Sequence, residues 1–214
     1  MTADLDAAVK HYNALADSYD RATRLINKTR LAAIARLAPR AGEIVVDAGC
    51  GTGFCLGPLR EAVGASGVVI GFEPAAAMLH VARQRVAAAG WDNVYLMETD
   101  ASVVRLSHRA DAWLFSYTHD LLQSRSALSH LLGQGKTGAR VAATGSKLFT
   151  PWLWPGNLWV QWRHRRYITD PKSLAAPWLT LSEFLEDQRI DAAPFAQHYL
   201  ATGRVRPGLT DTPG

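Results

Sequence analysis

The sequence predicts a doubly wound α/β fold, in which about seven mostly parallel strands form a sheet with helices on both faces. Two observations predict it. Short runs rich in β-branched residues alternate with helix-like stretches at a regular pitch, which is typical of parallel β-α-β units. The length of 214 residues, 48% of them hydrophobic, also suits one globular domain with a single core.

The first expected element is a helical N-terminal cap over about residues 1–40. Asp4–Leu15 and Arg21–Leu37 have helical periodicity, and the second stretch would present one apolar face. Pro39 and Gly42 then end the helical pattern. The apolar face would comprise Leu25, Ile26, Leu31, Ile34 and Leu37.

Strands and helices should then alternate as far as Gly145. Glycines at positions 64, 90 and 133 close three of the helical stretches. The expected strands are Glu43–Asp47, Gly67–Glu73, Val94–Glu98, Asp111–Tyr117 and Ala139–Gly145, and the expected helices are Phe54–Val63, Ala75–Ala89, Ala101–Leu106 and Ser126–Leu132.

After Gly145 the alternation stops. A Trp/Arg-rich insertion should occupy about residues 150–190, with a helix at Leu179–Asp187. Gln197–Val205 alternates like a strand and would help to complete the sheet. Residues 207–214 are typical of a frayed end, so a single domain is expected over residues 1–206.

Composition bounds the location and the chemistry. No apolar run reaches the roughly 18–20 residues that cross a bilayer, and the polar N-terminus lacks the pattern of a signal peptide. We therefore expect a cytoplasmic protein. The only cysteines, Cys50 and Cys55, form no CxxC or Cys/His cluster, so no metal site is expected. The net charge of +4 is a modest excess, which gives little support to nucleic-acid binding.

The most informative segment is IVVDAGCGTGF, residues 44–54. Gly49, Gly51 and Gly53 lie directly between a strand and a helix, where glycines let the backbone turn sharply and approach a ligand. Asp47 ends the strand before them, and Glu73 ends the next strand, 20 residues after Gly53. An acid at that spacing accepts hydrogen bonds from ribose hydroxyls. The segment therefore predicts a nucleoside cofactor, and the lack of glycine at position 54 disfavours a dinucleotide.

With these motifs in view, the chain resembles the class I S-adenosylmethionine-dependent methyltransferases, whose sheet is Rossmann-like. The resemblance runs from about Tyr12 to Gly145 and keeps the family's order of motifs. DAGCGTG resembles the first motif, GFEPAAAML the segment with the ribose-binding acid, ETDA the adenine-contacting segment, ADAWLFSY the fourth-strand motif, and YNALADSYD the N-terminal cap.

This resemblance implies that S-adenosylmethionine is the cofactor. The backbone of Gly49, Gly51 and Gly53 would make room for its methionine part, and Asp47 would contact the amino group. Glu73 would hold the ribose diol; many relatives have aspartate there, and both acids reach a diol.

The same resemblance implies contacts on the adenine side. Asp100 would accept a hydrogen bond from the adenine amino group, with the Ala101 amide nearby, although Asp100 would serve equally well as a helix N-cap. Met78 would pack on the adenine or simply fill the core. Tyr12 and Tyr19 would close over the site or pack the N-terminal helices.

Acceptor chemistry should lie at the carboxyl end of the fourth strand, where open α/β sheets bind their ligands. A sulfonium methyl is already activated, so alignment matters most, and a base is needed only if the acceptor must lose a proton. His119 is the candidate base or acceptor-orienting group, with a structural histidine as the alternative. Tyr117 is a candidate substrate contact, and Asp120 an expected N-cap. The Asn/Asp-Pro-Pro-Tyr signature is absent, which counts against an amide or nucleobase acceptor.

The Trp/Arg-rich insertion leaves several interpretations open. Trp159, Trp162 and Arg166 would share one helical face. They would suit the lid of an apolar acceptor pocket, a peripheral contact with a membrane surface or a grip on an anionic group, and simple packing is the alternative. Trp159 and Trp162 are thus candidate substrate contacts.

The function that we expect is methyl transfer to a small-molecule or lipid-like acceptor, without nucleic acid as a partner. One alternative is transfer of the 3-amino-3-carboxypropyl group of the same cofactor. A second is RNA binding through the basic aromatic segment.

Overall fold

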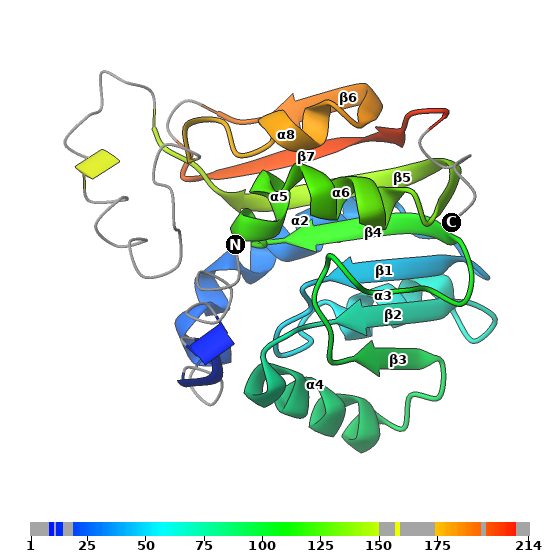
Figure 1. Ribbon diagram of the computed structural model, residues 1–214. Helices are drawn as coiled ribbons and strands as arrows, with labels where there is room; N and C mark the ends of the chain where they lie inside the picture. Colours follow the sequence, from blue (N-terminus) through cyan, green and yellow to red (C-terminus); the bar gives the residue numbers. More distant parts are fainter. Residues whose placement is uncertain are drawn as a thin grey trace.

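The computed structural model describes residues 9–10, 12–14, 19–149, 157–158, 174–193 and 196–208. These residues form a seven-stranded sheet in the order β3-β2-β1-β4-β5-β7-β6 (Figure 1). Strands β1 to β5 are parallel to one another, whereas β7 runs antiparallel to both β5 and β6. The predicted fold class is therefore confirmed, including the small antiparallel part.

Strands β1 to β5 and β7 overlap the predicted strands, and β6 was not predicted. Parallel pairing sets Asp47 of β1 beside Gly71 of β2 and Leu114 of β4, so the carboxyl ends of these three strands meet at one edge of the sheet. The strand bounds are β1 Ile44–Ala48, β2 Val68–Phe72, β3 Val94–Met97, β4 Ala110–Ser116, β5 Gly135–Ser146, β6 Leu185–Asp191 and β7 His198–Val205.

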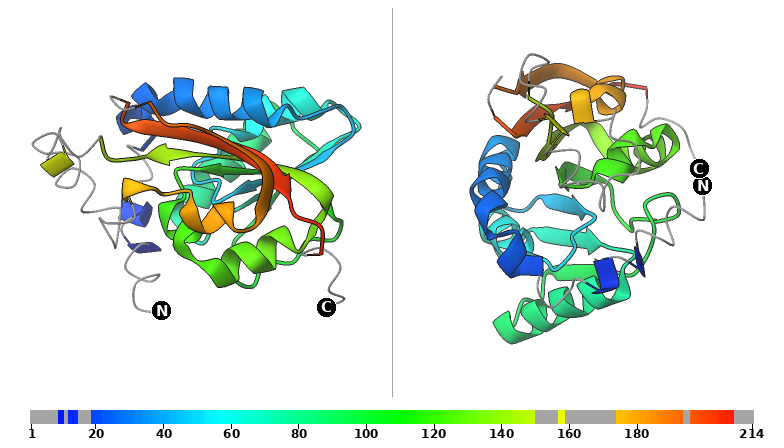
Figure 2. Two further views of the ribbon diagram at one scale, coloured as in Figure 1. Left: turned by 90° about the horizontal axis from the view of Figure 1, so that it is seen from above. Right: turned by 90° about the vertical axis from the view of Figure 1, so that its left-hand side faces the viewer.

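Helices cover both faces of this sheet (Figure 2). Alternate residues of β4 explain the two layers, because Leu114 packs into the core beneath α2 and α3 while Trp113 and Phe115 pack beneath α5 and α6. One layer comprises α2 Asn27–Leu37, α3 Leu56–Val63 and α4 Ala76–Ala89, and the other comprises α5 His119–Gln123, α6 Arg125–Leu132 and α8 Leu179–Ser182.

The buried face of α2 differs from the predicted one. The short 3-10 helix η1, Arg24–Ile26, leads into α2, and Leu25 is 87% exposed while Leu31 is 45% exposed. The residues that face the sheet have the spacing i, i+3, i+4, i+7 of a single helix face. They are Arg30, Ala33, Ile34 and Leu37. The small side chain of Ala33 lets the helix pack closely on the strands, and it brings Arg30 inside.

Two other helix predictions were wrong. No helix forms at residues 101–106, because the amides of Ser102 and Val104 donate to Asp100 and close a turn there. The expected helix over residues 179–187 ends at Ser182, and β6 begins at Leu185 and pairs with β7. Pairing with the open edge of β7 outweighs the helical periodicity of this segment.

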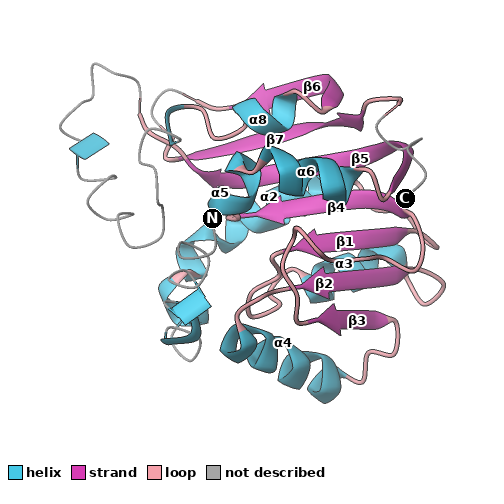
Figure 3. Cartoon of the chain, in the orientation of Figure 1, coloured by secondary structure: helices cyan, strands magenta, loops and turns pink. Residues whose placement is uncertain are grey.

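Strands and helices thus follow one another from β1 to β5, and the described residues after β5 contain α8, β6 and β7 (Figure 3). None of the helices in the described residues is long and apolar enough to cross a membrane. The candidate residues Trp159 and Trp162 lie outside the residues that the structure describes.

Candidate functional site

A cavity of about 420 Å³ opens at the carboxyl edge of β1, β2 and β4. It lies where open α/β sheets bind their ligands. Residues from the N-terminal cap, the glycine loop, the ends of β2 and β4, and the turn after β3 form its wall together. Ten of the predicted residues line it: Tyr12, Tyr19, Gly49, Gly51, Glu73, Met78, Asp100, Ala101, Tyr117 and His119.

The three glycines of the loop have different surroundings. Gly49 has φ +69°, and a Cβ there would come within 2.6 Å of the Thr118 methyl group. Gly51 has φ +55°, and no atom lies within 4 Å of where its Cβ would be. Gly53 differs, because its Cβ would meet Leu56 and Ala82, so it serves the packing of α3 and α4. The open space is therefore in front of Gly51, whereas Gly49 allows the Thr118 side chain to pack closely on the loop.

Glu73 follows β2 and faces this space. Its Oε2 accepts the amide of Gly51 at 3.1 Å and its Oε1 accepts the amide of Ala75 at 2.9 Å. Burial raises the pKa of this carboxyl, and the two amide hydrogen bonds lower it. A carboxylate offers about four lone-pair positions. Glu73 is thus fixed in place with acceptor capacity left for two hydroxyl groups.

Asp47, near the end of β1, has fewer hydrogen bonds than Glu73. It is 1% exposed, and its Oδ2 has no hydrogen-bond partner among the described residues. Burial raises the pKa of Asp47 to about 7; the Arg30 guanidinium lowers it and Glu73 raises it further. A buried carboxylate without a partner is costly. The arrangement fits a cationic donor supplied by a ligand, such as the ammonium of a methionine moiety.

A second, smaller cavity of about 30 Å³ contains this carboxylate. It adjoins the larger cavity, because Tyr19, Gly49, Gly51 and Ser116 line both. A water-sized group needs about 10–15 Å³ on this measure, so the volume suits about two small polar groups. Together the two cavities fit a long ligand with a charged end at β1.

Residues of the predicted adenine side also meet here. Asp100 lines the cavity while its Oδ1 accepts the Ser102 amide at 2.8 Å, so it caps a turn and faces the ligand space at once. Met78 is 1% exposed and packs with Tyr12 and Tyr19, and it too borders the cavity. The core and ligand-contact interpretations of Met78 are therefore compatible.

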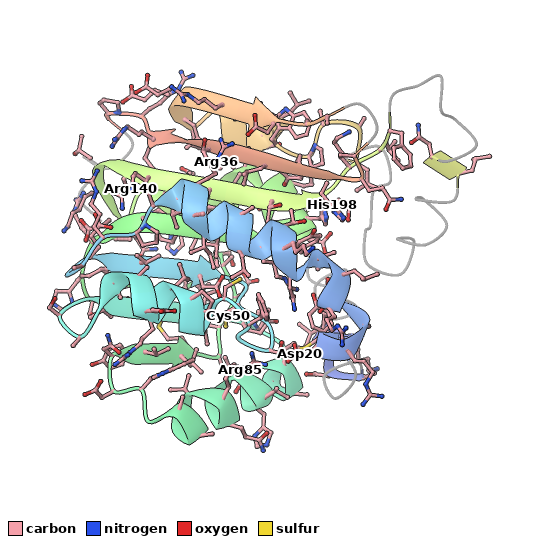
Figure 4. All side chains as sticks on the ribbon, turned by 180° about the vertical axis from the view of Figure 1, so that it is seen from behind. Asp20, Arg36, Cys50, Arg85, Arg140 and His198 are labelled. Atoms are coloured by element: carbon pink, nitrogen blue, oxygen red, sulfur yellow. The ribbon has the colours of Figure 1, made fainter. Side chains whose placement is uncertain are left out.

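The N-terminal cap is fastened over the site by polar contacts. Asn13 accepts the amide of Ala77 in the first turn of α4 at 2.8 Å. Asp20 accepts a hydrogen bond from the Thr52 hydroxyl of the glycine loop and forms an ion pair with Arg85 of α4 (Figure 4). The cap thereby bridges the loop and α4.

The acceptor-side candidates follow β4. Tyr117 has φ +62°, rare for a large side chain, and its hydroxyl lies 3.0 Å from Nδ1 of His198 on β7. Burial raises the pKa of this phenol, so it is neutral at pH 7. His119 is buried, and its Nε2 accepts the Ser146 amide at 3.1 Å. Asp120 is the second residue of α5 rather than its N-cap, since Thr118 holds the N-cap position.

Sequence reasoning missed Arg30. This residue lines the small cavity beside Asp47 and is 5% exposed. The signal was present, because Arg30 stands at the first place of the spacing shared with Ala33, Ile34 and Leu37. A cation at a core position of an amphipathic helix indicates a special environment.

Comparison with known proteins agrees with this geometry. Residues 45–135 match a methyltransferase domain family. The aklanonic acid methyltransferase DauC of Streptomyces sp. (strain C5) is 36% identical over 108 residues, which are 50% of this chain and 49% of that protein. The chain thus spans about half the length of this curated relative.

Solved structures share the fold over most of the chain. A SAM-dependent methyltransferase from Aquifex aeolicus superposes with a TM-score of 0.71 and 19% identity, covering 90% of this chain and 98% of the other. An O-methyltransferase family protein from Burkholderia thailandensis gives a TM-score of 0.68 and 16% identity, covering 92% and 60%. Residues 45–135 thus match a methyltransferase domain family, and the chain has the fold of S-adenosylmethionine-dependent methyltransferases.

Proposed function

We propose that this chain transfers the methyl group of S-adenosylmethionine to a small-molecule or lipid-like acceptor. One observation carries the proposal: Asp47 and Glu73 stand at the carboxyl edge of adjacent parallel strands and face adjoining cavities. Among the described residues, Asp47 Oδ2 has no hydrogen-bond partner, whereas two amides fix Glu73. A positively charged amino group suits the first acid, and a pair of hydroxyls suits the second.

The remaining wall residues suit the rest of such a cofactor. Asp100 and the Ala101 amide would contact the adenine, with Met78 packed on its ring. Tyr12 and Tyr19 would cover it and exclude water. Bound there, the cofactor supplies an electrophilic methyl group, so the protein's main task is to align an acceptor with it.

His119 suits the alignment of an acceptor better than the role of base. Its Nε2 already accepts the Ser146 amide, so the neutral ring carries its proton on Nδ1. In that tautomer the Nδ1–H is the group that His119 would offer to an acceptor oxygen. Removing a proton would first require the Ser146 bond to break. Tyr117, on the same side of the cavity, offers a neutral phenol as a second polar contact.

The acceptor that we propose is a small organic molecule. The relative that is 36% identical carries the name of an organic acid, aklanonic acid, which supports this class over a nucleic acid. We also propose that Trp159 and Trp162 form apolar contacts with the acceptor. The Trp/Arg-rich insertion would in addition contact a membrane surface.

The test is an incubation of the purified protein with cell extract and methyl-labelled S-adenosylmethionine, followed by mass spectrometry. We expect S-adenosylhomocysteine and a labelled small molecule. Methylthioadenosine in place of S-adenosylhomocysteine would mean that the 3-amino-3-carboxypropyl group moves instead. Label found only in RNA would contradict the proposed acceptor class.

A further inference from the structure

Arg30 occupies an unusual environment for an arginine. It projects from the sheet-facing side of α2 and is 5% exposed. Three aromatic rings surround its guanidinium, at 5.8 Å from the centroid of Tyr19, 5.4 Å from that of Phe54 and 5.6 Å from that of Tyr117. Such contacts stabilise a cation that has lost part of its hydration. The cage therefore holds a charged guanidinium inside the protein.

This cation has only neutral hydrogen-bond partners in the described part of the chain. Arg30 donates to the Thr23 hydroxyl at 3.4 Å, the Asn27 amide oxygen at 3.2 Å and the Tyr19 hydroxyl at 3.5 Å. Buried charges are normally paired, and among the same described residues Arg85 pairs with an aspartate and Arg140 with a glutamate. Within the described residues Arg30 forms no such ion pair.

Arg30 and Asp47 face the same small cavity. Both line the space of about 30 Å³ beside Gly49 and Gly51. The positive charge of Arg30 lowers the pKa of Asp47. Within the described residues, however, the two side chains do not come within ion-pair distance. An anion and a cation are thus held apart across a space that adjoins the larger cavity.

We propose that Arg30 binds the carboxylate of the cofactor's amino-acid end while Asp47 binds its ammonium, an inference that rests on the proposed function. The guanidinium presents a planar pair of donors that matches a carboxylate. The rings around it come from the N-terminal cap, the glycine loop and the end of β4. The protein would therefore bind both charged groups of the amino-acid part, the carboxylate through Arg30 and the ammonium through Asp47. A cofactor analogue that lacks either group should bind less tightly.

The experiment is calorimetric titration with three ligands that differ only at this end. S-adenosylmethionine carries both charges, its decarboxylated form lacks the carboxylate, and 5′-methylthioadenosine lacks the amino-acid part. We expect the wild type to bind S-adenosylmethionine about 10- to 100-fold more tightly than the decarboxylated form, as a charge-assisted hydrogen bond implies. Arg30→Gln should abolish this difference and leave methylthioadenosine binding unchanged.

Two further variants complete the test. Arg36→Gln is the matched control, because Arg36 is on the same helix, is exposed and pairs with Asp191 at 3.1 Å (Figure 4); it should bind all three ligands like the wild type. Asp47→Asn should weaken S-adenosylmethionine and its decarboxylated form by the same factor, since both keep the ammonium.

Some outcomes would overturn the inference. A wild type that binds the decarboxylated form as tightly as S-adenosylmethionine contradicts it without any variant. So does an Arg30→Gln protein that loses affinity for all three ligands equally, since that pattern means a structural role. If the wild type discriminates as expected but forms no methylated product, the proposed function fails while the assignment of Arg30 stands. If it binds none of the three ligands, both fail.

Discussion

The two halves of the sheet are built differently. The half formed by β1 to β4 has parallel strands and falls almost wholly within the segment that matches the methyltransferase domain family. Asp47 and Glu73 lie at its carboxyl edge. The half beyond Ser146 has β7 inserted antiparallel between β5 and β6, and it lies outside the matched segment. In the first half Asp47 is the last residue but one of β1 and Glu73 directly follows β2. In the second half His198 contacts Tyr117 from a strand 81 residues away in sequence.

This difference indicates that the two halves have different functions. The carboxyl ends of parallel strands and the helices that follow them form a fixed site for a constant ligand, whereas an antiparallel edge can change without disturbing that site. We therefore expect the effect of substitutions on cofactor affinity to fall from the first half to the second. The four predictions below test this order.

The largest effect is expected at Glu73. Glu73→Ala removes an acceptor for the ribose hydroxyls, and a hydrogen bond to a charged group contributes about 1.5–3 kcal/mol. The dissociation constant of S-adenosylhomocysteine should rise about 10- to 100-fold by calorimetry. Glu61→Ala, at an exposed glutamate of α3, is the control and should have no effect. An unchanged constant for Glu73→Ala would show that the ribose is held elsewhere.

Asp47 should make cofactor affinity depend on pH. Its pKa in the free protein is raised to about 7 by burial, and only the ionised form can pair with an ammonium. Affinity should thus be constant above pH 7 and fall by about tenfold per pH unit below it, since one proton must leave on binding. Asp47→Asn should bind weakly at every pH. If the variant keeps the same pH dependence, another group, such as Glu73, is responsible.

A smaller effect is expected at Asp20. This residue ties the N-terminal cap to Arg85, and both side chains are partly exposed, at 43% and 31%. Exposed ion pairs contribute at most about 1 kcal/mol. Asp20→Asn should therefore weaken S-adenosylhomocysteine no more than about fivefold, mainly through faster dissociation in stopped-flow measurements. A loss as large as that of Glu73→Ala would make the cap part of the primary binding site.

The smallest effect on cofactor affinity is expected at Trp159 and Trp162. If the Trp/Arg-rich insertion contacts the acceptor, replacing either residue with alanine should leave cofactor binding unchanged and lower turnover. If these residues only pack, either change should cost about 3–5 kcal/mol of stability and lower the melting temperature. Melting and cofactor binding measured on the same samples distinguish the two. A large melting shift with normal turnover per folded molecule would exclude the acceptor contact.

The parts of the site that could be predicted are local in sequence. Asp47 and Glu73 were found because each follows a buried strand at a spacing set by one β-α-β unit. Arg30 was missed because its burial depends on how α2 rotates over β4 and β5, and the leucines of that segment suggested another face. The strand β6 was missed because Leu185–Asp191 is mostly polar, and only the open edge of β7 gives it a partner. The helical spacing of α2 is compatible with either face, so periodicity alone did not decide which one is buried.

The central claim is that the carboxyl edge of β1 and β2 holds a nucleoside joined to an amino acid. The most direct measurement is one calorimetric titration of the wild type with S-adenosylhomocysteine and one with NAD⁺, a dinucleotide that shares the ribose. We predict saturable binding of one S-adenosylhomocysteine per chain and none of NAD⁺, because Asp47 requires a cationic partner where a dinucleotide presents phosphates. Binding of NAD⁺ with no binding of S-adenosylhomocysteine would contradict the account.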